Sequence, residues 1–281
     1  MDGNNQIVND LKNHMDAMFC FASKVPYRED HLLPVIQACK SLIGLNLQHP
    51  PRILLKWMEK YMQEFQPNSQ DIESLSDSEK PEVLSMIHLK KLIESEQVEE
   101  SRSYLYNLLQ VANHSYIMEL ILEISFQRST TAALFCWSAY KSIQFMIPKD
   151  SKGILFLSLD YLYKSEKGRN IEKDNAKIFY LYCHSHHIKQ KEMIRSEKIV
   201  PIFLVKMKTI QLASNYNDII PGQLLTSIQK EGEKGILNYL LSLGINEISP
   251  HCILLLDALL FAIRYAPEQD GVLGFKKENI C

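Results

Sequence analysis

Residues 129–146 read STTAALFCWSAYKSIQFM, and this stretch decides the fold class. The hydroxyl residues Ser129, Thr130 and Thr131 stand before a run whose apolar side chains recur at steps of three and four. Hydroxyl groups cap the unbonded N–H groups of a first helical turn, and this apolar spacing is typical of a helix with one buried face. Pro148 closes the run, because proline has no backbone donor. The stretch therefore predicts a helix.

The same apolar spacing continues on both sides of this stretch. Before it, the spacing predicts helices over 7–22, 32–43, 54–65, 83–93, 104–112 and 116–126. After it, helices are predicted over 154–163, 174–188, 192–199, 202–213, 224–230, 236–243 and 251–265. Gly44 follows the second helix, where its tolerance of positive φ suits a helix C-terminus. Roughly a dozen helices joined by short loops predict an all-α chain.

Short links between helices also bear on the architecture. Consecutive helices with short links are usually antiparallel neighbours, so the sequence predicts an irregular stack of helical hairpins, as in armadillo, HEAT and tetratricopeptide solenoids. The stack is expected to be irregular because no period of about 33 to 45 residues repeats along the chain. An orthogonal helical bundle is the alternative architecture.

Residues 222–246, GQLLTSIQKEGEKGILNYLLSLGIN, carry one resemblance to a named unit. Gly232 stands at an interhelix turn, and the leucine pair Leu240 and Leu241 is followed by a closing glycine, Gly244. In these positions the segment resembles the two-helix half of an ankyrin repeat. The usual Thr-Pro-Leu-His opening is absent and no neighbouring segment repeats the unit, so the resemblance implies a single helical hairpin.

Residues 66–80 interrupt the helical pattern. They contain four acidic residues, one basic residue and almost no large apolar side chains, too few to offset the entropy cost of ordering the segment. We therefore predict a flexible acidic linker here. It divides the chain into an N-terminal helical subdomain, 1–65, and a helical-repeat domain, 81–281.

Two serines in this linker are candidate phosphorylation sites. Ser74 and Ser76 each precede an acidic residue by three positions, a pattern that acid-directed kinases favour. A phosphate on either serine would add about −1.5 to −2 charge to an already acidic segment. The alternative is a solvated loop without modification.

Composition and cysteine spacing bound the class of protein. The chain has 281 residues, with 46% hydrophobic and 23% charged residues, which are ordinary values for a globular protein. It has no run of about 18 apolar residues, so no membrane partner is expected. Its six cysteines lie far apart and its first residues do not resemble a signal peptide, so we expect location in the cytosol or nucleus.

The charge distribution gives the main lead to function. Residues 141–210 contain 14 Lys or Arg against 7 Asp or Glu, whereas the rest of the chain contains 17 against 26. Clustered cations attract polyanions, so this basic stretch predicts a surface for an acidic protein partner or, alternatively, for nucleic acid. Two further alternatives are a solvated face without a partner and docking of the chain's own acidic segment, 59–100. The candidate partner-binding residues are Lys189, Lys191, Arg195, Lys198, Lys206 and Lys208.

Cys183 and His187 are the candidate metal ligands. They are four residues apart, so on a helix they share a face and two ligands could reach one metal. A further ligand would have to come from elsewhere, and the spacing selects none of the possible histidines, which include His14, His31, His88 and His251. The alternative places the histidines of this segment on a solvated helix face.

Other dense groups of residues have structural interpretations. Glu119 and Glu123 are four apart, as in half of a di-iron site, but no Glu-x-x-His partner motif is present, so we expect a solvated face. The aromatic residues between 135 and 163 recur at helical spacing and are expected in the core.

The function that these patterns favour is a non-enzymatic interaction module, which presents a helical groove with a basic surface to a peptide or an acidic protein partner. Common nucleotide-binding, hydrolase, zinc-protease and EF-hand motifs are absent, and no cofactor is expected. The alternatives are a nucleic-acid-binding helical-repeat protein and a helical metalloenzyme. The sequence does not indicate an oligomeric state.

Overall fold

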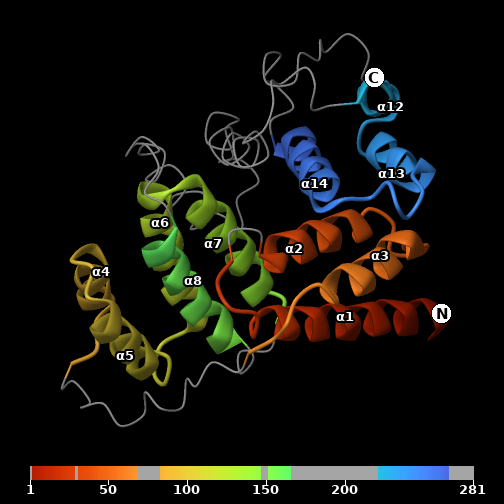
Figure 1. Ribbon diagram of the computed structural model, residues 1–281. Coiled ribbons are helices and arrows are strands. Elements are labelled where there is room, and N and C mark those ends of the chain that lie inside the picture. Colours follow the sequence, from red (N-terminus) through yellow and green to blue (C-terminus); the bar gives the residue numbers. More distant parts are fainter. Residues whose placement is uncertain (1, 29–30, 69–82, 147–150, 166–220, 266–281) are drawn as a thin grey trace. The chain divides into compact units, whose positions relative to one another are not determined.

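A computed structural model of the chain describes residues 2–28, 31–68, 83–146, 151–165 and 221–265. These residues form eleven α-helices and no β-strand, which confirms the all-α prediction for the described part of the chain (Figure 1). None of these helices combines the length and the apolar character that a membrane crossing requires.

The first three predicted helices are present as α1 (Asp2–Ala22), α2 (Leu32–Ile43) and α3 (Arg52–Met62). Gly44 was expected to adopt the left-handed conformation after α2, but its φ is not positive. Its amide instead donates to the Lys40 carbonyl at 3.0 Å, and the next amide donates three residues back, to Leu42. These bonds satisfy the last carbonyls of α2 without a left-handed residue.

The described chain divides into two compact units, each built from separate stretches of sequence. Unit 1 contains the described residues within 1–13, 35–64 and 177–281, and unit 2 contains those within 14–34 and 65–176. Helices α1 and α2 therefore contribute residues to both units.

In unit 1, α3 buries one face and anchors a distant loop. Trp57 and Tyr61 stack with ring centroids 5.1 Å apart, on the same side of α3 as the buried Leu54 and Met58. The indole N–H of Trp57 donates to the carbonyl of Ile248, 2.9 Å away and 191 residues further along the chain. A buried indole needs such an acceptor, so this bond fixes the loop around Ile248.

The last three described helices of unit 1 are α12 (Gly222–Glu231), α13 (Glu233–Ser242) and α14 (Pro250–Tyr265). Gly232 alone separates α12 from α13 and has a φ of +57°, a conformation that glycine adopts at little cost. The two helices pack against each other, so the hairpin predicted at 222–246 is present. Arg264 of α14 forms a two-pronged ion pair with Glu233 of α13, at 2.8 and 2.9 Å.

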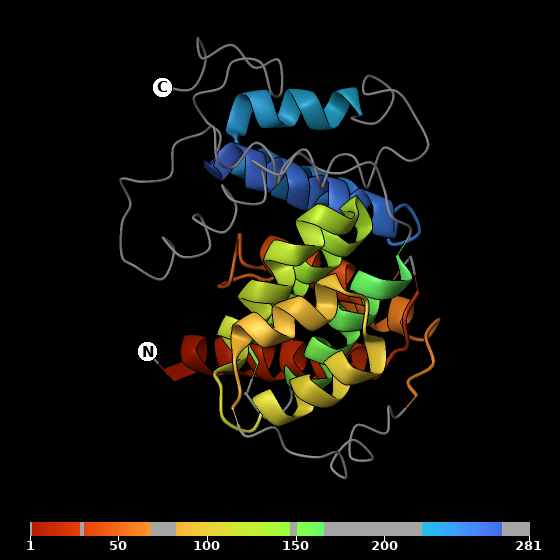
Figure 2. The ribbon, with the colours of Figure 1, turned by 90° about the vertical axis from the view of Figure 1, so that its left-hand side faces the viewer.

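In unit 2, α4 (Met86–Glu94) and α5 (Val98–Leu108) form a hairpin, and the two helices lie side by side in Figure 2. The turn between them is a Schellman motif, in which the amides of Gln97 and Glu96 donate to the carbonyls of Leu92 and Ile93. Glu96 occupies the left-handed position with a φ of 60°, where glycine is usual.

Three further described helices belong to unit 2: α6 (His114–Arg128), α7 (Thr130–Ile143) and α8 (Lys152–Lys164). Ser129 caps α7 as predicted, because its hydroxyl accepts the amide of Ala132 at 3.0 Å. Every residue of α8 from Ile154 to Leu162 is buried, and the helix packs against α5, α6 and α7. A helix that is buried on all sides lies in the centre of a core, so α8 is the central helix of the described part of unit 2.

Several predicted features fall outside the described residues. The predicted linker lies mostly within 69–82, and the helices predicted at 174–188, 192–199 and 202–213 lie within 166–220. The division of the chain at residues 66–80 into subdomains 1–65 and 81–281 therefore stays a prediction.

Candidate functional site

The residues predicted to carry function lie outside the described part of the chain. Ser74 and Ser76 fall within 69–82. The six basic candidates, Lys189, Lys191, Arg195, Lys198, Lys206 and Lys208, and the metal-ligand candidates Cys183 and His187 all fall within 166–220. Their roles stay predictions.

Two of the three described lysines of the basic stretch, Lys141 and Lys164, contact neighbouring side chains. The ammonium group of Lys141 lies 5.0 Å from the ring centroid of Trp137, and that of Lys164 lies 3.2 Å from a carboxylate oxygen of Asp160. Such contacts fix the direction of a long side chain. These two cations therefore contribute to packing as well as to the basic charge.

A charged cluster joins α5 and α8 inside unit 2. Asp160 is buried, and its two carboxylate oxygens accept from Arg102 at 2.6 Å and from Lys164 at 3.2 Å. The Arg102 guanidinium also lies over the Phe156 ring, 5.4 Å from its centroid. Each member of the cluster has a partner, so the arrangement is one that stabilises the packing of α5 on α8.

The Asp160 cluster gives a test of this structural role. Asp160→Asn removes a charge and leaves the half-covered Arg102 without its counterion, so the free energy of unfolding should fall by about 2 kcal/mol. Urea unfolding followed by circular dichroism measures this change. Glu94→Gln, which removes an exposed carboxylate 4.0 Å from Lys90, should cost less than about 0.5 kcal/mol. Equal effects of the two substitutions would contradict a structural role for Asp160.

His31, one of the histidines considered as a metal ligand, forms hydrogen bonds to the backbone with both of its ring nitrogens. Its Nδ1 accepts the amide hydrogen of Leu33 at 3.0 Å, so the proton of the neutral ring is on Nε2, which donates to the carbonyl of Val25 at 3.1 Å. Both nitrogens thus hold the segment that joins α1 to α2. Among the described residues, no group of three or more His, Cys, Asp or Glu side chains could hold a metal ion.

The aromatic side chains of α7 and α8 form part of the core, as predicted. The rings of Phe135 and Tyr161 stack in parallel with centroids 3.7 Å apart, and His31 contacts the edges of both. The Tyr161 hydroxyl donates to the carbonyl of Arg28. The other aromatic residues buried here are Trp137, Tyr140 and Phe156. This cluster packs α7 and α8 against the segment between α1 and α2.

The buried thiols are poor nucleophiles. Burial raises the pKa of Cys136 to about 12, and burial together with the charge of Asp257 raises the pKa of Cys39. Because only a thiolate reacts readily, both side chains stay protonated and inert at neutral pH. They act as small apolar side chains in the core.

These thiols give a labelling prediction. Iodoacetamide at pH 8 should leave Cys39 and Cys136 unmodified in the folded chain and should modify both once the chain is unfolded in urea. Mass spectrometry of digested protein measures the modified fraction at each residue. Rapid labelling of Cys136 without denaturant would contradict the burial that the structure shows.

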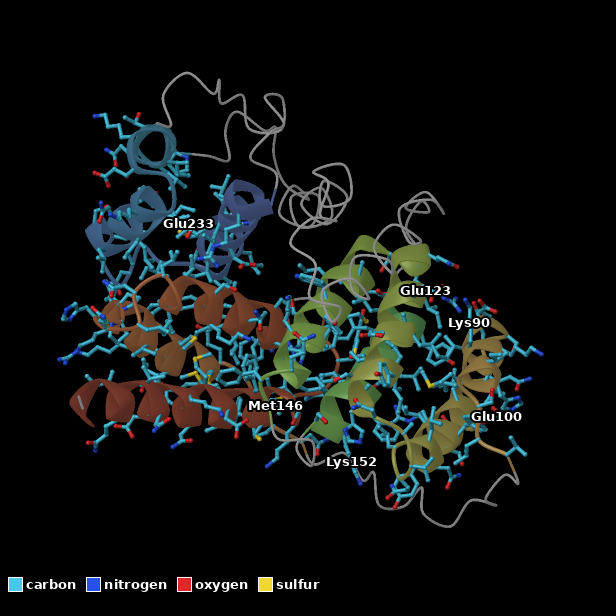
Figure 3. All side chains as sticks on the ribbon, turned by 180° about the vertical axis from the view of Figure 1, so that it is seen from behind. Lys90, Glu100, Glu123, Met146, Lys152 and Glu233 are labelled. Carbon is cyan, nitrogen blue, oxygen red and sulfur yellow. The ribbon has the colours of Figure 1, made fainter. Side chains whose placement is uncertain are left out.

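The paired carboxylates on α6 differ from the sequence prediction. Glu123 pairs with Lys90 of α4 at 3.2 Å, near the surface (Figure 3). Glu119 is only 5% exposed, so the prediction that both face solvent was wrong for this residue. Glu119 lies one turn before Glu123 and next in sequence to the buried Ile117 and Met118. The sequence pattern did not indicate that this carboxylate is buried.

The clusters that sequence reasoning missed are long-range pairs. Arg102 and Asp160 are 58 residues apart, and no local pattern joins them. The available signal was Asp160 itself, a single carboxylate in the apolar run from 154 to 162, because a buried charge requires a partner.

Comparison of the chain with protein-family models, with curated proteins and with solved structures found no match. The resemblance of residues 222–246 to an ankyrin hairpin therefore rests on the residues of that segment alone.

Proposed function

We propose that the chain is a non-enzymatic interaction module that binds an acidic protein partner. The observation that carries the proposal is the exposure of large apolar side chains in unit 2, foremost Val83 just before α4, Ile87 in α4 and Tyr116 in α6. Contiguous exposed apolar surface on a protein commonly marks a site for another protein. The excess of cations in residues 141–210 would steer an acidic partner towards the chain.

The proposed framework is an irregular stack of helical hairpins. The pairs α4–α5 and α6–α7, each joined by a short link, support this arrangement. The contact of α8 with α5, as well as with α6 and α7, supports an orthogonal bundle as the alternative. In either arrangement the partner would bind in a groove between neighbouring helices.

A binding assay distinguishes an acidic protein ligand from nucleic acid. Fluorescence anisotropy with labelled polyglutamate and with single-stranded RNA, at 50 and 200 mM salt, measures both affinities. The proposal predicts binding of polyglutamate that is lost in a variant with Lys189, Lys191, Arg195 and Lys198 all changed to Glu. Tighter, strongly salt-dependent binding of RNA that is lost in the same variant would instead support the nucleic-acid alternative.

The metalloenzyme alternative has its own measurement. Metal analysis of the purified chain would have to find a stoichiometric transition metal that is lost on Cys183→Ser or His187→Ala. A metal content that is unchanged by both substitutions would remove this alternative.

A further inference from the structure

The most exposed apolar side chains of the described residues gather at one end of the α4–α5–α6 layer. Ten large apolar residues of the described stretches are exposed, and the four most exposed of these are Val83 at 76%, Val111 at 71%, Ile87 at 68% and Tyr116 at 58%. Helices joined by short turns alternate in direction, so the start of α4, the end of α5 and the start of α6 share one end of the layer. We name these four residues the apolar end.

Hydrogen bonds fix the backbone that carries the apolar end. The Tyr104 hydroxyl of α5 accepts the amide of Ser85 at 2.6 Å and lies 3.3 Å from the carbonyl of Val83. Ser85 in turn caps α4 by accepting the amide of Ile87 at 3.2 Å. The exposed side chains Val83 and Ile87 are therefore held outward by an ordered backbone.

The link between α5 and α6 is fixed in a similar way. One ring nitrogen of His114 lies 3.3 Å from the Leu109 carbonyl, and the other lies 2.6 Å from the hydroxyl of Ser151, at the start of α8. These contacts hold the turn that carries Val111 and the first turn of α6, which carries Tyr116. Preorganised surface of this kind loses little entropy on binding.

Two contacts set the register of α4 against α6. Lys90 pairs with Glu123 at 3.2 Å (Figure 3), and further along both helices Arg128 donates to the carbonyl of Ile93 at 2.9 Å. Because both contacts advance in the same direction, α4 and α6 run the same way here. Ile87, three residues before Lys90, and Tyr116, seven residues before Glu123, lie on the helix sides that these contacts join.

The exposed charges of the described residues around the apolar end are positive. Among the described residues within 83–91, 104–120 and 151–155, the acidic side chain is Glu119, which is buried. The cations are Lys90, which pairs with Glu123, the exposed Lys91 one turn after Ile87, and the half-buried Lys152 beside Ser151. A partner with apolar anchors and acidic flanks complements this surface.

We propose that the apolar end binds an acidic amphipathic helix of a partner protein. This inference rests on the proposed function and names its docking surface. Apolar side chains at three- and four-residue steps of the bound helix contact Ile87 and Tyr116, with Val83 and Val111 at the margin. Acidic side chains on its flanks lie near Lys91 and Lys152, where they improve specificity and association rate.

The test uses two synthetic helical peptides of 20 residues with the full chain. Both peptides have leucines at steps of three and four, and their other positions are mainly Glu in one and Lys in the other. The Glu peptide should bind the wild type, and the double variant Ile87→Ser, Tyr116→Ser should bind it at least about tenfold more weakly. The matched control, Leu241→Ser with Ile245→Ser, removes exposed apolar side chains of unit 1 and should leave affinity unchanged.

Other results would overturn the inference. Equal or tighter binding of the Lys peptide contradicts the acidic partner, and unchanged binding of the Glu peptide by the double variant contradicts the docking surface. If the quadruple Glu variant of Lys189, Lys191, Arg195 and Lys198 loses binding while the double variant keeps it, the docking surface is wrong and the proposed function stands. Circular dichroism of each variant checks that it remains folded.

Discussion

Gly235→Ala should destabilise the hairpin of α12 and α13 more than any other single methyl group added to a described glycine. A Cβ at residue 235 would lie 2.1 Å from the backbone oxygen of Ser227 and 2.4 Å from its carbonyl carbon. The clash is with backbone, so no side chain can rotate away, and the two helices must separate. We expect the free energy of unfolding to fall by about 3 kcal/mol.

Gly222→Ala is the matched control for this prediction. A Cβ at residue 222, the first residue of α12, meets no atom within 4 Å, so the substitution causes no clash. The higher helix propensity of alanine should raise the free energy of unfolding by at most about 1 kcal/mol. Urea unfolding followed by circular dichroism measures both variants. Equal stabilities of the two alanine variants would show that α12 and α13 do not pack as closely as the structure indicates.

Tyr161→Ala should have the largest effect in unit 2, a loss of about 4 kcal/mol of unfolding free energy. The substitution removes a buried ring that stacks on Phe135, contacts Tyr27 and His31, and bonds the Arg28 carbonyl. The residual cavity is enclosed by α7, α8 and the segment between α1 and α2, so it cannot collapse readily.

Tyr161→Phe separates the ring from the hydroxyl. This variant keeps the stacked ring and loses the hydrogen bond to Arg28, so it should cost about 1 kcal/mol. The same unfolding measurement compares the two variants. A phenylalanine variant as unstable as the alanine variant would mean that the hydroxyl, and not the packing of the ring, holds this cluster together.

The positions of the helices could be predicted from the sequence because their signals are local. Ser129 caps α7, as expected from the hydroxyl residues before its apolar run, and Ser249 caps α14 in the same way, since its hydroxyl accepts the amide of Cys252 at 3.1 Å. The apolar steps of α2 gave its bounds without error. Such signals act within one or two helical turns, so they do not depend on the tertiary fold.

The long-range contacts could not be predicted, because nothing in a local pattern names a distant partner. The bond from Trp57 to Ile248 and the pair of Arg102 with Asp160 are of this kind. Gly235 is another case. The sequence indicates a glycine near the start of a helix, and only the packing shows that a Cβ would collide with Ser227.

The apolar end shows what helical spacing leaves open. Residues 83–93 were expected to form one helix from their apolar positions, yet α4 begins at Met86 and Ile87 is exposed. Ile87 lies about 200° around the helix from the buried Leu89, since each residue turns by about 100°. That displacement was visible in the sequence, and it marks an apolar side chain outside the main buried face.

The predicted basic residues between 189 and 208 lie outside the described part of the chain, so binding is the direct test of their role. The central claim is that the chain binds an acidic protein through its basic surface. Affinity purification from cells that express the chain, read by mass spectrometry, should enrich an acidic protein with the wild type. The variant with Lys189, Lys191, Arg195 and Lys198 changed to Glu should lose it. Retention of the same proteins by both forms, or recovery of nucleic acid in place of an acidic protein, would contradict the claim.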